Sequence, residues 1–494
     1  MALDPRTPIL VGGGQFNNRS GGVEPVDLIA EAARAAAGEA GSDRILTRID
    51  SIRLVRMLSW RYRNPGLLVA ERLGARVVHT AYTGDGGNGP QTLVSAAAAD
   101  ILAGRSEVVL VGGAEAWRTR MGLRAEGQRP DWTKQDDDVE LPELAIPEVP
   151  MVFDGHKRIG LDRPAFVYPL FEDALRSSAG RSVSEHREAI GRLWSRFADV
   201  STTNPHAWTQ RPHTAEEIIT PSQRNRWICR PYTKLLNSNN MVEQAAAVLV
   251  CSVGVATELG IPRDNWVFIH SAADAHDTYD ITERGRLDGS AAIRVAGARA
   301  LEDAGVAVGD VEHVDLYSCF PSAVQVAAHE LGLPTDDPSR PLTVTGGLTF
   351  AGGPWNNYST HAIATMATTL RANPGHRGLV TANGGYLTKH AMGVYGTEPP
   401  ARAFVHRDVQ AEVDAFPTVT AEADFVGSAR IEAYSVAHAR DGAPERAFVA
   451  VRTPGGGRSL IGTERAEIVD ALIEEDQVGS AARVDSVGVL AGLF

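Results

Sequence analysis

Two distant segments of the chain resemble each other, and this repetition constrains the fold more than any other feature. Residues 28–38 and 296–305 are Ala-rich stretches in which apolar residues recur three and four positions apart. Each ends near a glycine, and a short β-branched run follows at 49–55 and 311–317. This order of signals predicts a helix, a stop and a strand, twice over.

A second matching pair follows each copy. Residues 97–113 and 363–385 both predict a helix, a turn, a buried strand and a Gly-Gly turn. The uninterrupted apolar run Val108–Val111 is typical of a strand that helices cover on both faces. The sequence therefore predicts an α/β protein with two duplicated halves, in which helices sandwich two sheets as α/β/α/β/α layers. The alternative is that Ala-rich helices in a biased composition look alike by chance.

The pattern changes after about Pro400. Ala429–Val436 and Ala447–Arg452 alternate with period two, and Pro454–Gly457 forms a turn between strands. We expect a small β-rich, barrel-like domain here, although the alternation would also fit an elaborate edge of the core sheet. The predicted domains are residues 1–275, with a loop and cap region at about 118–240, residues 276–402, and residues 403–494.

Charge and cysteine content narrow the classes of function. The formal net charge of −13 argues against a nucleic-acid surface. Cys229, Cys251 and Cys319 form no Cys-x-x-Cys pair, so we expect neither a metal site nor disulfides, and a reducing cytosol fits best. Residues 1–15 carry no signal-peptide pattern, and no run approaches the roughly 18 apolar residues of a membrane span. We expect a cytoplasmic, bacterial protein.

The glycine motifs, in their order and spacing, resemble the thiolase superfamily over about residues 5–400. They are Thr7–Gln15, Gly87–Leu93, Gly112–Glu115, Gly346-Gly347, Gly352-Gly353-Pro354 and Asn383-Gly384-Gly385. The resemblance is greatest to sterol carrier protein-type thiolases and their bacterial thiolase-like relatives with an additional C-terminal β domain. Relatives of this kind would be called acetyl-CoA acetyltransferases.

The resemblance also shows what this chain lacks. Thiolases carry a nucleophilic Cys at a helix N-terminus, a Gly-His-Pro histidine and a second Cys in a Cys-x-Gly loop. The corresponding positions here are Gly86, Gly353 and the sulfur-free loop 381–385. Ordinary thiolase activity is therefore not expected, because no thiolate remains to attack a thioester.

Other side chains remain as catalytic candidates. Tyr317 aligns with an oxyanion-hole residue of thiolases, and Tyr386 directly follows Gly385. Both could act as hydroxyl catalysts in retro-aldol cleavage of a 3-hydroxyacyl-CoA, or could merely fill the space of lost groups. His361 and His390 are the nearest histidines and could supply a base, although structural roles are the more ordinary explanation. Cys319 is interpreted as a buried thiol beside the substrate.

Backbone groups can bind a thioester even where catalytic side chains are missing. We expect Gly86, Gly87 and Asn88 at a helix start, with Asn383, Gly384 and Gly385 at a strand end, to present N–H groups to a carbonyl. Gly353 is also assigned to the substrate-binding residues. Arginines of the cap could meet CoA phosphates or could be ordinary exposed side chains, namely Arg224, Arg226 and Arg230.

The resemblance thus implies an acyl-CoA-binding protein of the acetyl-CoA acetyltransferase group, with coenzyme A as part of the substrate and no separate cofactor. The alternatives are the retro-aldol lyase and a non-catalytic acyl-CoA or lipid carrier. The assembly is left open between a monomer and a homodimer.

Overall fold

The computed structural model describes residues 3–486 and 488–493. The core sheet has the order β10-β11-β12-β9-β1-β8-β4-β2-β3-β5, and β13 pairs with β9. The strands of the first half are β1 (Pro8–Asn17), β2 (Ser51–Leu54), β3 (His79–Thr83), β4 (Val108–Ala116), β5 (Glu143–Ile146) and β8 (Glu243–Ser252). Those of the second half are β9 (Val267–His276), β10 (His313–Asp315), β11 (Arg377–Gly384), β12 (Lys389–Gly396) and β13 (Val405–Asp408).

The strand order confirms the duplication. In the first half β2 runs parallel to β4, β4 is antiparallel to β8, and β8 is antiparallel to β1. In the second half β10, β11, β12 and β9 follow each other with the same parallel and antiparallel pairings. The two halves of this sheet join at a short pairing between β1 and β9, where Ile9 pairs with Phe268 and Leu10 with Val267. Each half is therefore one copy of the same sheet topology.

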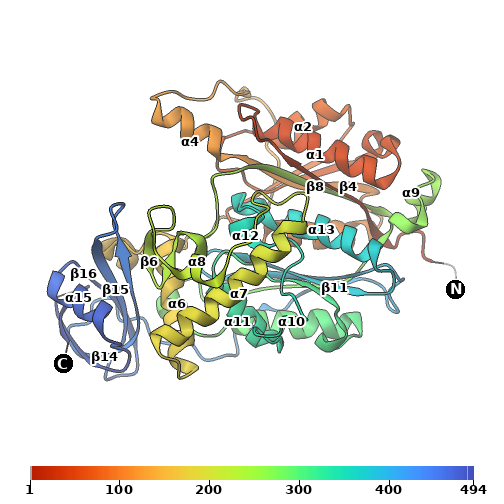
Figure 1. Cartoon of the computed structure of the whole chain (residues 1–494). Helices are drawn as coiled ribbons and strands as arrows, with labels where there is room; N and C mark the ends of the chain where they lie inside the picture. The colour runs from red at the N-terminus through yellow and green to blue at the C-terminus, as the bar shows by residue number, and fades with distance from the viewer. Residues whose placement is uncertain (1–2, 487, 494) are drawn as a thin grey trace.

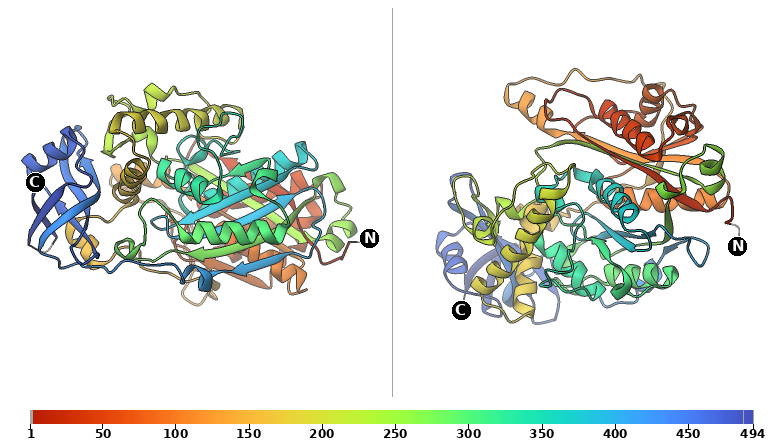
Figure 2. Two further views of the ribbon diagram at one scale, coloured as in Figure 1. Left: turned by 90° about the horizontal axis from the view of Figure 1, so that it is seen from below. Right: turned by 45° about the vertical axis from the view of Figure 1, so that its right-hand side comes forward.

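Helices form the remaining layers of the core (Figures 1 and 2). α3 (Gly89–Leu102) and α13 (Tyr358–Ala372) contact strands of both halves and lie between them. α1 (Pro25–Ala40) and α2 (Pro65–Leu73) cover the outer face of the first sheet, while α10 (Ala291–Ala304) and α11 (Pro321–Leu331) lie outside the second. The expected α/β/α/β/α layering is thus confirmed.

The edge strand β3 is covered by a strand from its own chain. β5 pairs with β3 in parallel, from Ala81 opposite Glu143 to Thr83 opposite Ile146. An uncovered edge strand exposes a row of N–H and C=O groups to other chains. The segment between α4 (Trp117–Ala125) and residue 150, which falls in the expected loop and cap region, therefore includes one short strand that closes this edge.

The cap stands over one end of the core. Its helices are α5 (Asp154–Ile159), α6 (Pro164–Ser178), α7 (Val183–Thr203) and α8 (Ala215–Ile219), followed by β6 (Trp227–Arg230) and β7 (Tyr232–Thr233). α7 begins with a capping box in which Ser182 and Glu185 exchange hydrogen bonds. The remaining short helices are α9 (Val253–Glu258), α12 (Gly347–Phe350) and α14 (Gln410–Val413).

The C-terminal region is a closed five-stranded barrel at the end of the molecule opposite the N-terminus (Figure 2). Its strands are β14 (Gly427–His438), β15 (Pro444–Arg452), β16 (Arg458–Thr463), β17 (Ala481–Ser486) and β18 (Val489–Leu493). The ring closes because β14 pairs with both β15 and β17. β6 of the cap continues this sheet beside β14, and α15 (Ala466–Glu474), which the sequence did not indicate, packs on the barrel. None of the helices in the described residues is long and apolar enough to cross a bilayer.

Candidate functional site

Four loops from both halves meet at the start of α3. They are the β3–α3 turn, the β10–α11 loop, the segment before α13 and the β11–β12 turn. The Gly86 N–H donates to Asn356 Oδ1 at 3.0 Å, and the Ser359 hydroxyl donates to the Gly87 carbonyl at 3.1 Å. The site is therefore built by the packing of one half against the other.

Glycine at positions 87 and 384 permits this close approach. A Cβ atom on Gly87 would overlap the Tyr317 hydroxyl and the Asn383 carbonyl oxygen. A Cβ atom on Gly384 would overlap Asn88 Oδ1 and lie 3.0 Å from the Gly86 Cα. No side chain fits at either position unless its neighbours move.

Polar groups at the start of α3 have no protein partner. Among the described residues, no hydrogen bond is made by the N–H groups of Gly87 and Asn88. The buried side-chain oxygens of Asn88 and Asn383 also lack partners. Two donors and two acceptors are thus left for a ligand or water.

Tyr317 and Cys319 line the same place and are both buried. Burial, and then Cys319, raises the pKa of Tyr317 well above its usual value. Burial raises the pKa of Cys319 to about 12, so near neutral pH it is a thiol and not a nucleophilic thiolate.

Tyr168 of α6 holds the β11–β12 turn in position. Its hydroxyl accepts hydrogen bonds from Asn383 Nδ2 and the Leu387 N–H, both at 2.9 Å, and its ring stacks on Phe320 with centroids 4.4 Å apart. Sequence reasoning missed Tyr168 because nothing local links the cap helix to a turn more than 200 residues away.

Lys389 is the only buried lysine of the described chain; Lys134, Lys157 and Lys234 are exposed. Its ammonium donates to the Asp85 carbonyl, and Nζ lies 2.9 Å from where a Cβ of Gly86 would be. Burial lowers the pKa of Lys389, against the opposing effects of Glu148 and Asp85. The Lys389 ammonium therefore lies next to the Cβ position of residue 86. Lysine is rare in this sequence, and Lys389 follows closely after Gly384-Gly385. Together these two facts were the sequence signal that could have identified Lys389 as a site residue.

The segment after β5 covers the site from outside. Glu148 accepts a hydrogen bond from the Asp85 N–H at 3.1 Å and one from Arg56 at 2.7 Å. The Met151 sulfur lies against Gly385. Glu148 and Met151 thus pack against the two turns that carry Asp85 and Gly385.

The other expected site residues lie farther from the Gly87 turn or face other groups. Gly353 donates to the Asn239 carbonyl at 2.9 Å and joins the site through Asn356 on the same loop. The Tyr386 phenol lies near the charges of Asp162 and Arg163. Burial lowers the pKa of His361 to about 3, and its Nδ1 pairs with Gln15 Oε1 at 2.8 Å. His390 Nε2 contacts the Leu387 carbonyl at 3.1 Å, and His390 lines one small cavity together with Tyr317 and Asn383. Catalytic roles for Tyr386, His361 and His390 stay predictions.

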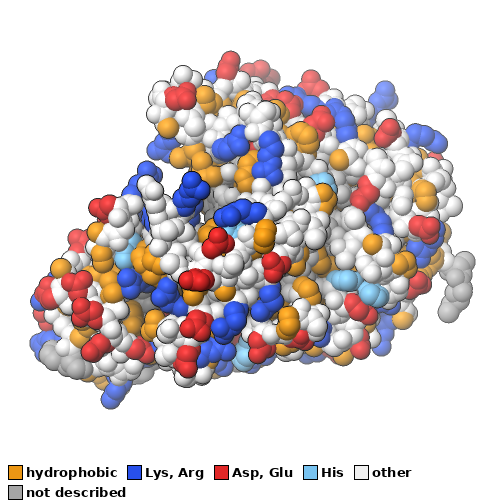
Figure 3. Space-filling view, viewed as in Figure 1, with side chains coloured by type: hydrophobic (Ala, Val, Ile, Leu, Met, Phe, Trp, Pro, Cys, Tyr) orange, Lys and Arg blue, Asp and Glu red, His pale blue; other side chains and the backbone are white. Residues whose placement is uncertain are grey.

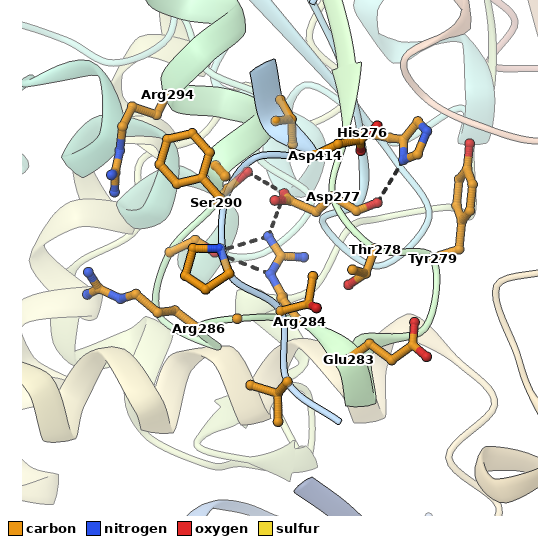
Figure 4. A pocket seen from close by; sticks show the side chains of 18 of the residues that line it. His276, Asp277, Thr278, Tyr279, Glu283, Arg284, Arg286, Ser290, Arg294 and Asp414 are labelled. Carbon is orange, nitrogen blue, oxygen red and sulfur yellow. Dashed lines mark hydrogen bonds and ion pairs between the residues drawn. The ribbon is translucent and has the colours of Figure 1, made fainter. Parts of the chain in front are cut away.

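A cavity of about 730 Å³ is lined mainly by residues 276–294 and 410–419 (Figure 4). At its inner wall Arg284 pairs with Asp277 at 3.0 Å and donates to the Leu387 carbonyl at 2.6 Å. Burial acts to raise the pKa of Asp277, but Arg284, His390 and Ser290 outweigh it and lower the pKa to about 2. This ion pair supports the turn that carries Tyr386 and Lys389.

Arginine and tryptophan side chains gather outside the site. Arg19 and Arg118 lie over the Trp208 ring, with Cζ at 4.0 and 5.7 Å from its centroid, and neither forms a salt bridge within the described chain. Trp117 packs edge-on against Trp355, which adjoins Asn356. The space-filling view shows the surface hollowed between α4 and the cap, with basic side chains around the hollow (Figure 3).

The cap arginines lie elsewhere. Arg224 is exposed, Arg226 donates to the Trp227 carbonyl at 2.8 Å, and the Arg230 Cζ lies 4.8 Å from the Trp227 centroid. Within the residues that the structure describes, no three His, Cys, Asp or Glu side chains cluster as a metal site would require.

Family models match two parts of the chain. The thiolase C-terminal domain-like family matches residues 273–397, and the thiolase-like protein type 1 additional C-terminal domain matches residues 408–488.

Solved and curated proteins are similar to the chain over different lengths. The crystal structure of a monomeric SCP2-thiolase like protein type 1 from Mycobacterium smegmatis is 34% identical, with a TM-score of 0.86 over 99% of this chain and 100% of that chain. The Ltp2-ChsH2(DUF35) aldolase shares the fold, at 21% identity and a TM-score of 0.59 over 81% of this chain and 100% of that one. The acetyl-CoA acetyltransferase of Methanothermobacter thermautotrophicus is 24% identical over 211 residues, 40% of this chain and 53% of the relative. The chain thus spans about half the length of that curated protein.

Proposed function

Because the chain belongs to the SCP2-thiolase-like proteins of type 1, we propose that it binds an acyl-CoA thioester without forming a covalent acyl-enzyme. One observation carries the proposal: Gly87 and Asn88 leave two N–H groups unpaired at the start of α3, where Tyr317 occupies the place of any side chain on Gly87. Unpaired N–H groups at a helix N-terminus favour a carbonyl oxygen that carries partial negative charge.

The surroundings support a thioester with a phosphorylated carrier. The Lys389 ammonium stands beside Gly86 and adds positive charge near the bound carbonyl. The orphan oxygens of Asn88 and Asn383 would accept hydrogen bonds from amide or hydroxyl groups of the ligand. Arg19 and Arg118, which lie over the Trp208 ring and form no salt bridge within the described chain, offer charge for phosphates.

A binding experiment tests this proposal. Calorimetry would use S-(2-oxopropyl)-CoA, a ketone analogue of acetyl-CoA that cannot transfer its acyl group. The Gly384→Ala variant places a methyl group 3.2 Å from the Gly87 nitrogen, so we expect its Kd to rise at least about tenfold. Gly122→Ala is the matched control, because nothing lies within 4 Å of its Cβ position.

Two results would contradict the proposal. The first is an absence of saturable binding by the parent chain, and the second is equal affinity of the parent and Gly384→Ala. An acetyl adduct on the intact mass after incubation with acetyl-CoA would contradict the non-covalent part.

A second candidate is retro-aldol cleavage of a 3-hydroxyacyl-CoA. It is favoured by the pairing of a hydroxyl donor, Tyr317, with an amine of lowered pKa, Lys389, in one site. The amine would take the proton of the C3 hydroxyl, the C2–C3 bond would break to give a carbonyl product, and a proton would return to C2 of the acyl-CoA enolate. Release of an aldehyde or ketone, absent in Lys389→Met and in Tyr317→Phe, is the expected result. No release by the parent chain would remove this candidate while leaving the binding proposal standing.

A further inference from the structure

A separate cavity of about 190 Å³ lies between the cap and the barrel. Its walls come from α6, α7 and β6 on one side and from β14 and α15 on the other. It is smaller than pockets that hold whole drug-sized ligands, and its size suits one small charged group.

Two arginines of this cavity have no carboxylate partner. The guanidinium carbons of Arg187 and Arg230 lie 5.1 and 4.8 Å from the Trp227 centroid, and neither side chain is in a salt bridge within the described chain. Burial lowers the pKa of both, and Arg187 lowers that of Arg230 further. No acidic group offsets either shift. The carboxylates at this cavity are otherwise engaged or unpaired with these arginines: Asp173 and Asp476 pair with Arg176, Glu172 contacts His186, and Glu474 and Glu475 form no salt bridge with either arginine. Arg187 donates one hydrogen bond to the Ile219 carbonyl at 2.7 Å, and Arg230 Nε lies 3.2 Å from His438 Nε2. Two half-buried cations thus lack a carboxylate partner within the described chain.

A buried histidine adds an unsatisfied nitrogen. His186 is 2% exposed and lines the cavity; its Nε2 contacts Glu172 Oε1 at 2.5 Å, while Nδ1 has no partner. The Arg187 Nε is also buried without an acceptor. Orphan polar atoms of this kind need an explanation, and an absent ligand is one.

From this geometry we infer that the cavity binds a phosphate or diphosphate group, held by Arg187, Arg230 and His186. Guanidinium groups bind phosphate oxygens through paired, charge-assisted hydrogen bonds. Imidazole Nδ1 can accept a P–OH proton or, once protonated, donate to a phosphate oxygen. The site lies on the cap–barrel interface and is distinct from the Gly87 turn, so it goes beyond the proposed function.

A buried polar chain leads from this cavity to the thioester site. Glu172 accepts a hydrogen bond from the Tyr232 hydroxyl at 2.6 Å, and this hydroxyl lies 2.9 Å from Ser322 Oγ. Ser322 begins α11 just after the loop with Tyr317 and Cys319. A phosphate at His186 would therefore act on the position of this loop through Glu172 and Tyr232.

Calorimetry with pyrophosphate on the full chain tests the inference. We expect saturable binding, a Kd that increases with salt concentration, and at least a tenfold loss in the Arg187→Gln/Arg230→Gln variant. Arg224→Gln, an exposed arginine of the same cap, is the matched control, and Gly384→Ala should leave pyrophosphate affinity unchanged. The double variant should also melt at a higher temperature than the parent without ligand, because two unbalanced charges are gone. This second measurement separates a lost site from a damaged fold.

The same calorimetry, repeated with ADP, distinguishes two possible sources of the phosphate group. Tighter binding of ADP than of pyrophosphate would assign the cavity to the diphosphate of a nucleotide-bearing ligand, and the reverse order to a free diphosphate or small phosphoester. The inference is overturned if pyrophosphate shows no saturable binding up to about 10 mM, or if the double variant binds it as well as the parent.

Discussion

At Gly87 the main chain of the first half touches the Tyr317 hydroxyl of the second half, with no space between them for a side chain. Gly384 makes a similar contact with Asn88 from the other side. Because the β3–α3 turn and the β11–β12 turn meet through glycines, we do not expect a single cysteine at position 86 to give thiolase activity.

We therefore expect Gly86→Cys to remain inactive in acyl transfer and to be less stable by about 1–3 kcal/mol, since its Cβ overlaps Asn88 Oδ1 and lies 2.9 Å from the Lys389 ammonium. Chemical denaturation and intact mass after acetyl-CoA treatment measure the two effects. Gly122→Cys, at an open position, should lose little stability. A stable Gly86→Cys variant carrying an acetyl group would refute the expectation.

The lowered pKa of Lys389 predicts a reactivity that depends on pH. An amine with a lowered pKa loses its proton at a lower pH than a lysine amine in water, for which the pKa is about 10.4. In trace acetylation with peptide mapping, the midpoint of Lys389 labelling in the folded chain should lie below the midpoint of the same residue in the urea-unfolded chain, each scaled to its own plateau. Unfolding free energy should also rise with pH between the folded and the unfolded pKa of Lys389, because the unfolded chain holds the proton longer. Lys389→Met should lack that rise, and equal midpoints in the folded and the unfolded chain would refute the prediction.

At the scale of elements, β5 closes the β3 edge and leads directly into residues 146–151 over the site. Replacing Glu143–Ile146 by Gly-Ser-Gly-Ser should uncover the N–H and C=O groups of β3 and promote association through that edge. Light scattering after size exclusion should show a larger mass than that of the parent. The same replacement at residues 126–129, outside any strand, is the control. An unchanged mass would show that β5 does not protect this edge.

Much of the element order could be predicted from sequence because it is local. Helix spacing, glycine stops and β-branched runs identified α1, β2, α10 and β10 and their duplication. Glycine turns likewise located the loops that form the site. Contacts between the loops were not predictable: Tyr168 reaches Asn383, and Asn356 reaches Gly86, across long sequence separations. Tyr317 and Tyr386 looked equivalent by motif, yet the phenol of Tyr386 lies near the cap charges of Asp162 and Arg163.

At the scale of the whole molecule, the barrel is joined to the rest by pairing and by buried charge. β14 pairs with β6 of the cap, and the fully buried Arg458 donates to Glu432 at two distances of 2.7 Å. The same guanidinium donates to the carbonyls of Thr282 and Arg284 in the second half. The ion pair lies within the barrel, and its arginine also hydrogen-bonds to backbone carbonyls of the core.

Arg458→Ala should lower the free energy of unfolding by about 3–5 kcal/mol, because it leaves buried core carbonyls without their donor and leaves Glu432 with Arg452 as its one remaining cationic partner in the described chain. Scanning calorimetry should then resolve a separate, earlier transition of the barrel. Arg483→Ala removes an exposed pair with Asp485 and should change stability by about 0–1 kcal/mol. A single unshifted transition in Arg458→Ala would mean that the barrel is held by other contacts.

The β5 strand has a thermodynamic consequence. A sheet edge closed by a second molecule is lost on dilution, so such a protein has a melting temperature that varies with its concentration. Here β5 and β3 belong to the same chain. The pairing of β5 with this edge is therefore a unimolecular step, and its equilibrium constant does not depend on protein concentration. At this edge the protein has the same protection at low copy number as in a concentrated sample.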